Sequence, residues 1–376
     1  MDWRVPLADL DYGVEEENAV LAVLRSKWLT MGAVTQAFEQ AFAAATGARF
    51  VFAVSNATEA LHLACLALEI GAGDEVITPS LSFVATSNAV LYTGADVRFA
   101  DVCGPDDLTI DPVDIERKIT PRTKAIIAMH YGGYPCRMAE IMAVAERHGL
   151  AVIEDAAHSP GASLGGRALG TWGALGCYSF FSNKNLSTGE GGMIVTDRED
   201  LAERIRMMRS HGMTTLTYDR HKGHAYTYDV VGLGYNYRID EIRSALGLEQ
   251  LKKLPHNNGL RGEWVQAYRH ALAQTEVGLP FASAAGNSAY HLIPVLLPGR
   301  VERKTVIDRM RADRIQTSIH YPPTHTFQYY QQRYGSVTLP VTEDLAAREL
   351  TLPLYPGMGQ EGVDLVVDSL KRALES

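Results

Sequence analysis

Residue types suited to covalent and acid–base chemistry follow two apolar stretches in the middle of the chain. Lys184 stands after the strand-like stretch Y-S-F-F and before the glycine-rich turn S-T-G-E-G-G. A lysine held partly out of water between aromatic residues and a close backbone turn can act as a nucleophile. Upstream, A-V-I-E-D-A-A-H-S places Asp155 and His158 after another apolar run. A carboxylate there can keep a cationic ring nitrogen protonated, while the plainer interpretations are a solvated lysine and a helix-capping acid.

Two further segments offer contacts for a planar, phosphorylated ligand. The stretch S-N-A-T-E-A at residues 55–60 opens a strong helix, whose first N–H groups can either be capped by Ser and Asn or bind a phosphate. The stretch P-S-L-S-F-V-A-T at residues 79–86 places Phe83 just after a strand. An aromatic side chain there belongs either to the core or to a platform for a ring. Both segments leave the two interpretations open.

The elements that carry these residues alternate between two periodicities. Helices are predicted over residues 58–69, 138–148 and 201–209, and short strands over residues 74–79, 125–129, 151–153, 177–181 and 193–196. Short apolar strands separated by helices of about a dozen residues are typical of a mostly parallel sheet covered on both faces. Ligands of such α/β sheets bind at the carboxyl ends of the strands, which is where Asp155 and Lys184 are expected.

The alternation weakens after residue 250 and predicts a second, smaller domain. A helix that begins near Asp240 is expected to end near Pro255, because proline interrupts a helix interior. A helix over residues 262–273, a strand within 291–298 and a helix over residues 363–374 follow. We therefore predict a large α/β domain over residues 1–254, to which the small α+β domain over residues 255–376 is attached; the N-terminal segment is allowed to pack with the small domain.

Composition excludes several classes of function. The chain has 35 Lys and Arg against 44 Asp and Glu, a net charge of −9, which argues against nucleic acid and anionic membranes as partners. Cys65, Cys103, Cys136 and Cys177 are far apart and show no zinc-ligand spacing, so four reduced thiols in a cytoplasmic protein are expected. The N-terminus does not resemble a secretory signal, and no apolar run approaches the ~20 residues that span a bilayer.

A polar segment over residues 214–228 is predicted to form a long surface loop. His221 and His224, with Asp219 nearby, have a spacing that would suit a metal on a helix. Because the local sequence D-R-H-K-G-H is typical of a loop, no metal site is predicted. Lys222 is either a solvated charge or a group that approaches a substrate diphosphate.

Seven ordered segments together resemble the DegT/DnrJ/StrS family of pyridoxal phosphate (PLP)-dependent sugar-nucleotide aminotransferases, over nearly the whole chain. They are S-K-W-L-T-M-G, S-N-A-T, P-S-L-S-F-V-A-T, I-E-D-A-A-H-S, S-F-F-S-N-K-N-L-S-T-G-E-G-G, G-Y-N-Y-R-I-D-E-I and I-H-Y-P-P-T-H. The resemblance implies the aspartate aminotransferase-like fold type I of PLP enzymes, with PLP and its amino form PMP as cofactor. It also implies roles for single residues.

Four residues are expected to contact the cofactor ring. By resemblance, Lys184 forms the internal aldimine and later acts as the base, Asp155 pairs with the pyridinium nitrogen, and Phe83 stacks on the ring. His158 lies beside the phenolic oxygen.

Other residues are expected to contact the cofactor phosphate and the substrate. Ala57, Thr58 and Ser179 are expected to hold the cofactor phosphate, and Asn236 to reach it from a second subunit, which implies a homodimer with active sites at the subunit interface. A final group, expected near the substrate, consists of Thr30, Tyr321 and His325.

The same resemblance implies the reaction. An amino group, from L-glutamate in most of the family, is expected to pass to the keto carbon of a nucleotide-linked sugar, and the turn after Lys184 favours C4 of a 4-keto-6-deoxyhexose such as dTDP-4-keto-6-deoxyglucose. The alternatives are a 3-keto sugar acceptor, a dehydratase or amino-acid-acting enzyme on the same scaffold, and a non-catalytic regulatory protein. Arg137 stands where relatives commonly have Asp, which changes the residue expected to cap the following helix.

Overall fold

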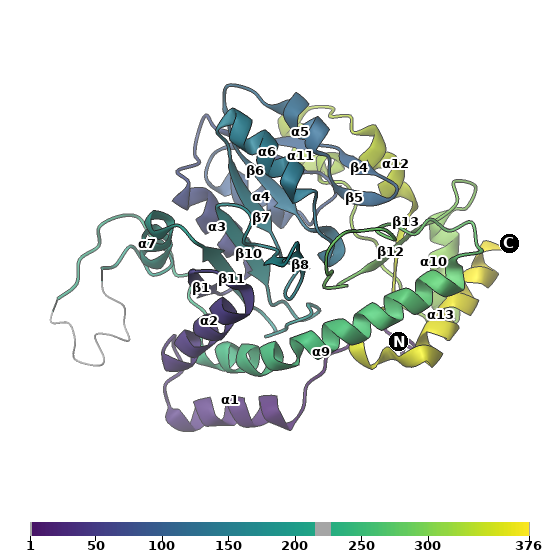
Figure 1. Cartoon of the computed structure of the whole chain (residues 1–376), viewed down its shortest axis with the longest axis horizontal. Coiled ribbons are helices and arrows are strands. Elements are labelled where there is room, and N and C mark those ends of the chain that lie inside the picture. Colours follow the sequence, from purple (N-terminus) through teal and green to yellow (C-terminus); the bar gives the residue numbers. More distant parts are fainter. Residues whose placement is uncertain (1, 215–226, 376) are drawn as a thin grey trace.

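The computed structural model describes residues 2–214 and 227–375, and a central seven-stranded sheet organises most of them (Figure 1). Its strands are β1 (Phe50–Val54), β2 (Glu75–Pro79), β3 (Asp96–Ala100), β6 (Thr123–Met129), β7 (Ala151–Asp155), β10 (Leu175–Ser179) and β11 (Gly192–Thr196). They lie in the order β1–β11–β10–β7–β6–β2–β3, and only β11 runs against its neighbours. The predicted α/β fold with a mostly parallel sheet is confirmed.

Helices cover both faces of the sheet because alternate strand residues point in opposite directions. In β6, Ile127 packs into a cluster with α3 (Ala57–Ala67), α4 (Ala85–Tyr92) and α7 (Glu199–Met208). Its neighbour Ile126 packs on the other face with α5 (Pro112–Lys118) and α6 (Met138–His148), and α2 (Ala33–Thr46) covers the β1 end of that face. The predicted helix over residues 138–148 coincides with α6.

One long helix connects the two halves of the molecule, and here the sequence prediction was wrong. The helix expected to end near Pro255 continues as α9 (Glu241–Leu272), with Pro255 inside it (Figure 1). Proline removes one backbone hydrogen bond, but α9 packs against α1 (Val14–Ser26) and α2 along its first half and against α13 (Gly359–Leu374) farther on, which outweighs that loss. The division of the chain at residue 254 stays a prediction.

A second core lies around the C-terminal part of α9. The antiparallel pair β12 (Ile293–Leu296) and β13 (Glu349–Leu352) packs with α13 and α10 (Arg303–Ala312). Val5, which bridges to Ile315, is buried in the same cluster. Among the residues that the structure describes, the remaining elements are β4 (Val102–Gly104), β5 (Asp107–Ile110), β8 (Ser163–Leu164), β9 (Arg167–Ala168), α11 (Gln328–Tyr334), α12 (Pro340–Arg348) and three 3-10 turns, Tyr131–Gly133, Thr324–Thr326 and Pro356–Met358.

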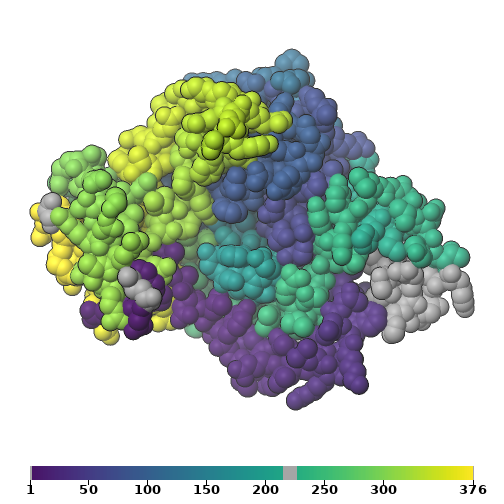
Figure 2. Space-filling model, turned by 180° about the vertical axis from the view of Figure 1, so that it is seen from behind, coloured from purple at the N-terminus to yellow at the C-terminus, as the bar shows by residue number. Residues whose placement is uncertain are grey.

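The carboxyl ends of the parallel strands bring distant segments together. Figure 2 shows teal residues from the middle of the chain bordered by purple N-terminal residues and by blue residues of the first third, with yellow-green residues of the C-terminal part packed onto the blue ones. Most of the residues singled out in the sequence follow the ends of β1, β2, β7 and β10.

Candidate active site

Lys184 follows β10 and is half-buried. Desolvation lowers the pKa of its ammonium group to about 8, and the negative charge of Asp155 opposes that shift. Its Nζ lies 3.4 Å from Nε2 of His291. A lysine with this pKa is partly neutral near physiological pH, as a nucleophile or a base must be.

Asp155 ends β7 and is buried, with 5% of its surface exposed. Its Oδ2 accepts a hydrogen bond from the Thr86 hydroxyl at 2.7 Å, and its Oδ1 accepts one from the Ala157 N–H at 3.2 Å. Burial raises the pKa of Asp155, while these two hydrogen bonds and the charge of Lys184 oppose the rise. Both direct partners are neutral, so the carboxylate can still accept a cationic partner.

His158 lies on the same side of the site. Its Nδ1 accepts a hydrogen bond from the Gly132 N–H at 3.1 Å, so the proton of the neutral ring is on Nε2, which lies 3.0 Å from the Tyr321 hydroxyl. Desolvation, helped by the charge of Lys184, holds the pKa of His158 well below its usual range. The structure therefore brings Lys184, Asp155, His158 and Tyr321 close to one another, and their roles stay predictions.

The start of α3 has the features of an anion site. The Asn56 side chain accepts the Glu59 N–H at 3.0 Å, and the first N–H groups of the helix, at Ala57 and Thr58, have no intrahelical partner. A Cβ on Gly192 would lie 2.6 Å from the Asn56 carbonyl carbon, so this glycine lets β11 approach the helix start closely. Ser179, at the end of β10, is 6% exposed.

Three predicted site residues lie on the surface of the single chain. The Phe83 ring is 57% exposed, with its centroid 6.0 Å from that of Tyr321. Thr30 and Asn236 are exposed, and their backbones bridge Asp240 and Ser210, respectively. The roles of Phe83, Thr30 and Asn236 stay predictions.

His325 is buried in a network of its own. Its Nδ1 lies 2.6 Å from the Ser80 hydroxyl and its Nε2 lies 3.2 Å from Glu343, so protein groups occupy both ring nitrogens. These contacts favour a role in joining the segment after β2 to the C-terminal region. Its place near the substrate stays a prediction.

Sequence reasoning missed His291, Asn185 and the pair Gly132–Gly133. Gly132 donates to His158 and its carbonyl accepts the His291 N–H at 2.9 Å, so this turn holds both rings. Gly133 has φ +85°, and a Cβ there would lie 2.7 Å from the His158 carbonyl oxygen. Two adjacent glycines after a predicted strand were the available signal; for His291, nothing in its local sequence distinguished it from a core residue.

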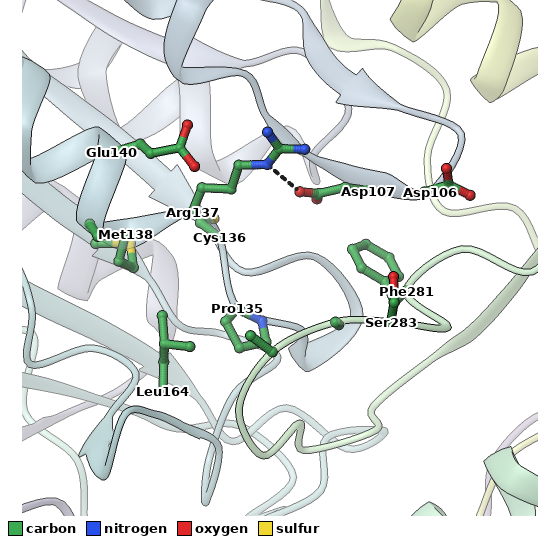
Figure 3. Close-up of a pocket in the computed structure, with 13 residues that line it drawn as sticks. Asp106, Asp107, Pro135, Cys136, Arg137, Met138, Glu140, Leu164, Phe281 and Ser283 are labelled. Atoms are coloured by element: carbon green, nitrogen blue, oxygen red, sulfur yellow. Dashed lines mark hydrogen bonds and ion pairs between the residues drawn. The ribbon is translucent and has the colours of Figure 1, made fainter.

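Figure 3 shows the residues that line a separate hollow. It has a volume of about 370 Å³ and includes none of the predicted site residues in its lining. Arg137 lines it and pairs with Asp107 at 3.1 Å, as the dashed line in Figure 3 marks. Arg137 immediately precedes α6 and makes no side-chain cap; its side chain pairs with Asp107 instead.

The described part of the chain offers neither a metal site nor a membrane-spanning helix. Over residues 2–214 and 227–375, no cluster of three His, Cys, Asp or Glu side chains has the arrangement of a metal site. None of the helices within those residues combines the length and apolar character needed to cross a bilayer. Asp219, His221, Lys222 and His224 lie outside the described residues, as does most of the predicted loop.

The chain is similar to a known protein family and to solved structures over nearly its whole length. The model of the DegT/DnrJ/EryC1/StrS aminotransferase family matches residues 11–371. The chain is similar to DesV of S. venezuelae, solved with a ketimine intermediate, at 33% identity, full coverage of both chains and a TM-score of 0.91. It is also similar to PseC of Helicobacter pylori, an aminotransferase involved in pseudoaminic acid biosynthesis, at 30% identity, full coverage of both chains and a TM-score of 0.91. A third similar structure is the PMP form of the putative sugar aminotransferase Spr1654 of Streptococcus pneumoniae, at 26% identity, 99% coverage of both chains and a TM-score of 0.94.

Proposed function

The chain belongs to the DegT/DnrJ/EryC1/StrS aminotransferase family, and we propose from this that it moves an amino group from L-glutamate to C4 of a nucleotide-linked 4-keto-6-deoxyhexose. It is a sugar aminotransferase, and its family is PLP-dependent. The donor, the acceptor carbon and the residues that serve them are the proposal. The observation that carries it is Lys184, a half-buried lysine with a pKa of about 8 beside the buried Asp155.

The residues at the strand ends fit PLP. When bound, the cofactor supplies an aldehyde that carries the amino group and a ring that accepts an electron pair. Asp155, whose direct partners are neutral, would face the ring nitrogen, and the exposed ring of Phe83 would stack on the cofactor. The N–H groups of Ala57 and Thr58, with the hydroxyl of Ser179, would hold the phosphate at the positive end of α3.

The chain's own groups then move the protons. With a pKa of about 8, the Lys184 amine is present in both its charged and its neutral form near neutral pH, so it can both accept and return a proton. Asp155 stays charged opposite a cation, because the cation offsets the cost of its burial. His158 keeps one proton on Nε2, where the Tyr321 hydroxyl lies 3.0 Å away.

A second subunit would complete the phosphate site. Asn236 is exposed on its own chain. Exposed apolar side chains at Leu10, Tyr12, Leu21 and Leu24 lie on and before α1, where burial against a partner would stabilise an assembly. These observations support the homodimer that the family resemblance implies.

The experiment first locates the cofactor. The purified protein with PLP is treated with borohydride, which fixes the lysine–cofactor bond, and the labelled peptide is identified by mass spectrometry. The label is expected at Lys184, lost in Lys184→Ala and kept in Lys252→Ala, which removes an exposed lysine of α9. A label elsewhere, or none, would overturn the proposal.

The second arm tests donor and acceptor. The loaded protein is mixed with glutamate or with other amino acids, and amine transfer is measured with dTDP-4-keto-6-deoxyglucose and with its 3-keto isomer. Product from glutamate and the 4-keto sugar supports the proposal. Transfer only to the 3-keto isomer, or only from another donor, would replace that part of it.

A further inference from the structure

We propose that His291 is a positioning residue that accepts a hydrogen bond from the free amine of Lys184 through Nε2, and that Asn185 fixes the ring in the form that can do so. The inference rests on the role proposed for Lys184. It concerns two residues that the family resemblance did not single out. His291, Asn185 and their further partner Asn258 are all buried, with 6%, 6% and 9% of their surfaces exposed.

A series of side-chain hydrogen bonds leads from Asn258 through Asn185 and His291 to Lys184, and two backbone carbonyls determine which atom donates in each of them. The Pro160 carbonyl can only accept, so the Asn258 group 2.9 Å away is its Nδ2 donor, which turns Oδ1 of Asn258 toward Asn185. The Ala289 carbonyl likewise requires the Nδ2 donor of Asn185 at 2.6 Å, and this Nδ2 also donates to Asn258 Oδ1 at 2.7 Å. The orientation of both amides follows without reference to histidine.

The state of the His291 ring is then determined. With both donors of Asn185 used, only its Oδ1 faces His291 Nδ1, at 3.0 Å. The Nδ1 must therefore carry the proton of the neutral ring, which leaves a lone pair on Nε2. That lone pair lies 3.4 Å from Lys184 Nζ, at the long end of hydrogen-bond distances and within reach after a small movement of a flexible side chain.

The neighbouring histidine has the opposite arrangement. The ring centroids of His158 and His291 are 4.4 Å apart, but His158 Nδ1 accepts the Gly132 N–H and its Nε2 faces Tyr321. His158 therefore has no lone pair left for Lys184, whereas His291 has one aimed at it. Other groups in electrostatic reach of His291 are Arg261 and His320.

The arrangement suits a lysine that is alternately bonded and free. During transamination the Lys184 amine is released and must stay in place to accept and return a proton. An acceptor for one N–H holds Nζ and directs the remaining lone pair away from His291. Because an acceptor favours the charged amine over the neutral one, His291 also offsets part of the desolvation that lowers the pKa of Lys184.

The test measures the pH dependence of Lys184 reactivity in the full-length protein freed of cofactor. Acetic anhydride labels neutral amines, and mass spectrometry follows the label at residue 184 across pH. The wild-type midpoint is expected at a pH of about 8. His291→Phe should lower it by about 1 pH unit, because the acceptor is lost while the ring volume is kept.

Three further variants keep the result interpretable. His291→Gln, whose amide oxygen can replace Nε2, should restore the wild-type midpoint, and His256→Phe, an exposed histidine on α9, should leave it unchanged. Asn185→Ala, which removes the group that fixes the His291 ring, should also lower the midpoint. It serves as the test if His291→Phe does not fold. An unchanged midpoint in folded His291→Phe, or in Asn185→Ala, would overturn the proposal, and neither result depends on the hydride label that tests the proposed function.

Discussion

Replacing Gly133 with alanine is expected to destabilise the turn on which both active-site histidines depend. Gly133 follows Gly132 directly, and its carbonyl accepts the Ala289 N–H at 3.1 Å and the Ser288 hydroxyl at 2.9 Å. The turn thus ties the end of β6 to the segment that carries His291. A change at residue 133 should be felt at both rings, although the side chain added is only a methyl group.

The magnitude follows from two costs. Alanine at φ +85° is strained by about 1–2 kcal/mol, as in other left-handed positions. The new Cβ would also lie 2.7 Å from the His158 carbonyl oxygen and 3.0 Å from Ala289 Cβ, an overpacking that typically costs about 1–3 kcal/mol. Together, Gly133→Ala should lower the free energy of unfolding by about 2–5 kcal/mol.

The assay is urea denaturation followed by circular dichroism, with Gly47→Ala as the matched control. Gly47 ends α2 at φ +75°, and a Cβ there would meet nothing within 4 Å, so only the backbone strain applies. The control should therefore lose about 1–2 kcal/mol. If Gly133→Ala costs no more than Gly47→Ala, the close contact with His158 does not constrain the turn and the reasoning fails.

Two other predictions concern charge and assembly. Burial raises the pKa of Glu349 from 4.5 to about 7. Between those pH values the folded chain therefore holds a proton that the unfolded chain has released. The free energy of unfolding falls by about 3 kcal/mol as the pH rises from about 4.5 to 7. Glu349→Gln should flatten this part of the pH–melting-temperature curve, and an unaltered curve would contradict the assignment. Mixing unfolded Lys184→Ala and Asn236→Ala chains and refolding them together should restore up to about a quarter of wild-type transamination, because each mixed dimer has one intact site; no recovery, with mixed dimers present, would place Asn236 in its own subunit's site.

The sequence predicted the elements and the chemistry that depend on local patterns. Short apolar runs ending in polar residues were enough to place Asp155 and Lys184 after strands of a mostly parallel sheet. In the structure Asp155 is the last residue of β7, and Lys184 follows β10. The helix at residues 138–148 was predicted to the residue, because its apolar period and the glycine after it are local signals. The family also followed from ordered segments of the chain itself.

Long-range packing decided the rest. Pro255 interrupts a helix only when nothing compensates for the lost hydrogen bond, and the compensation comes from α1, α2 and α13, which are distant in sequence. The partner of Lys184 is His291, 107 positions away, and its protonation state depends on Asn258 and on the Pro160 carbonyl. Residue types and spacing determine which side chains can react, but the position of a proton within a buried network depends on which carbonyls surround it, and only the folded chain brings these together.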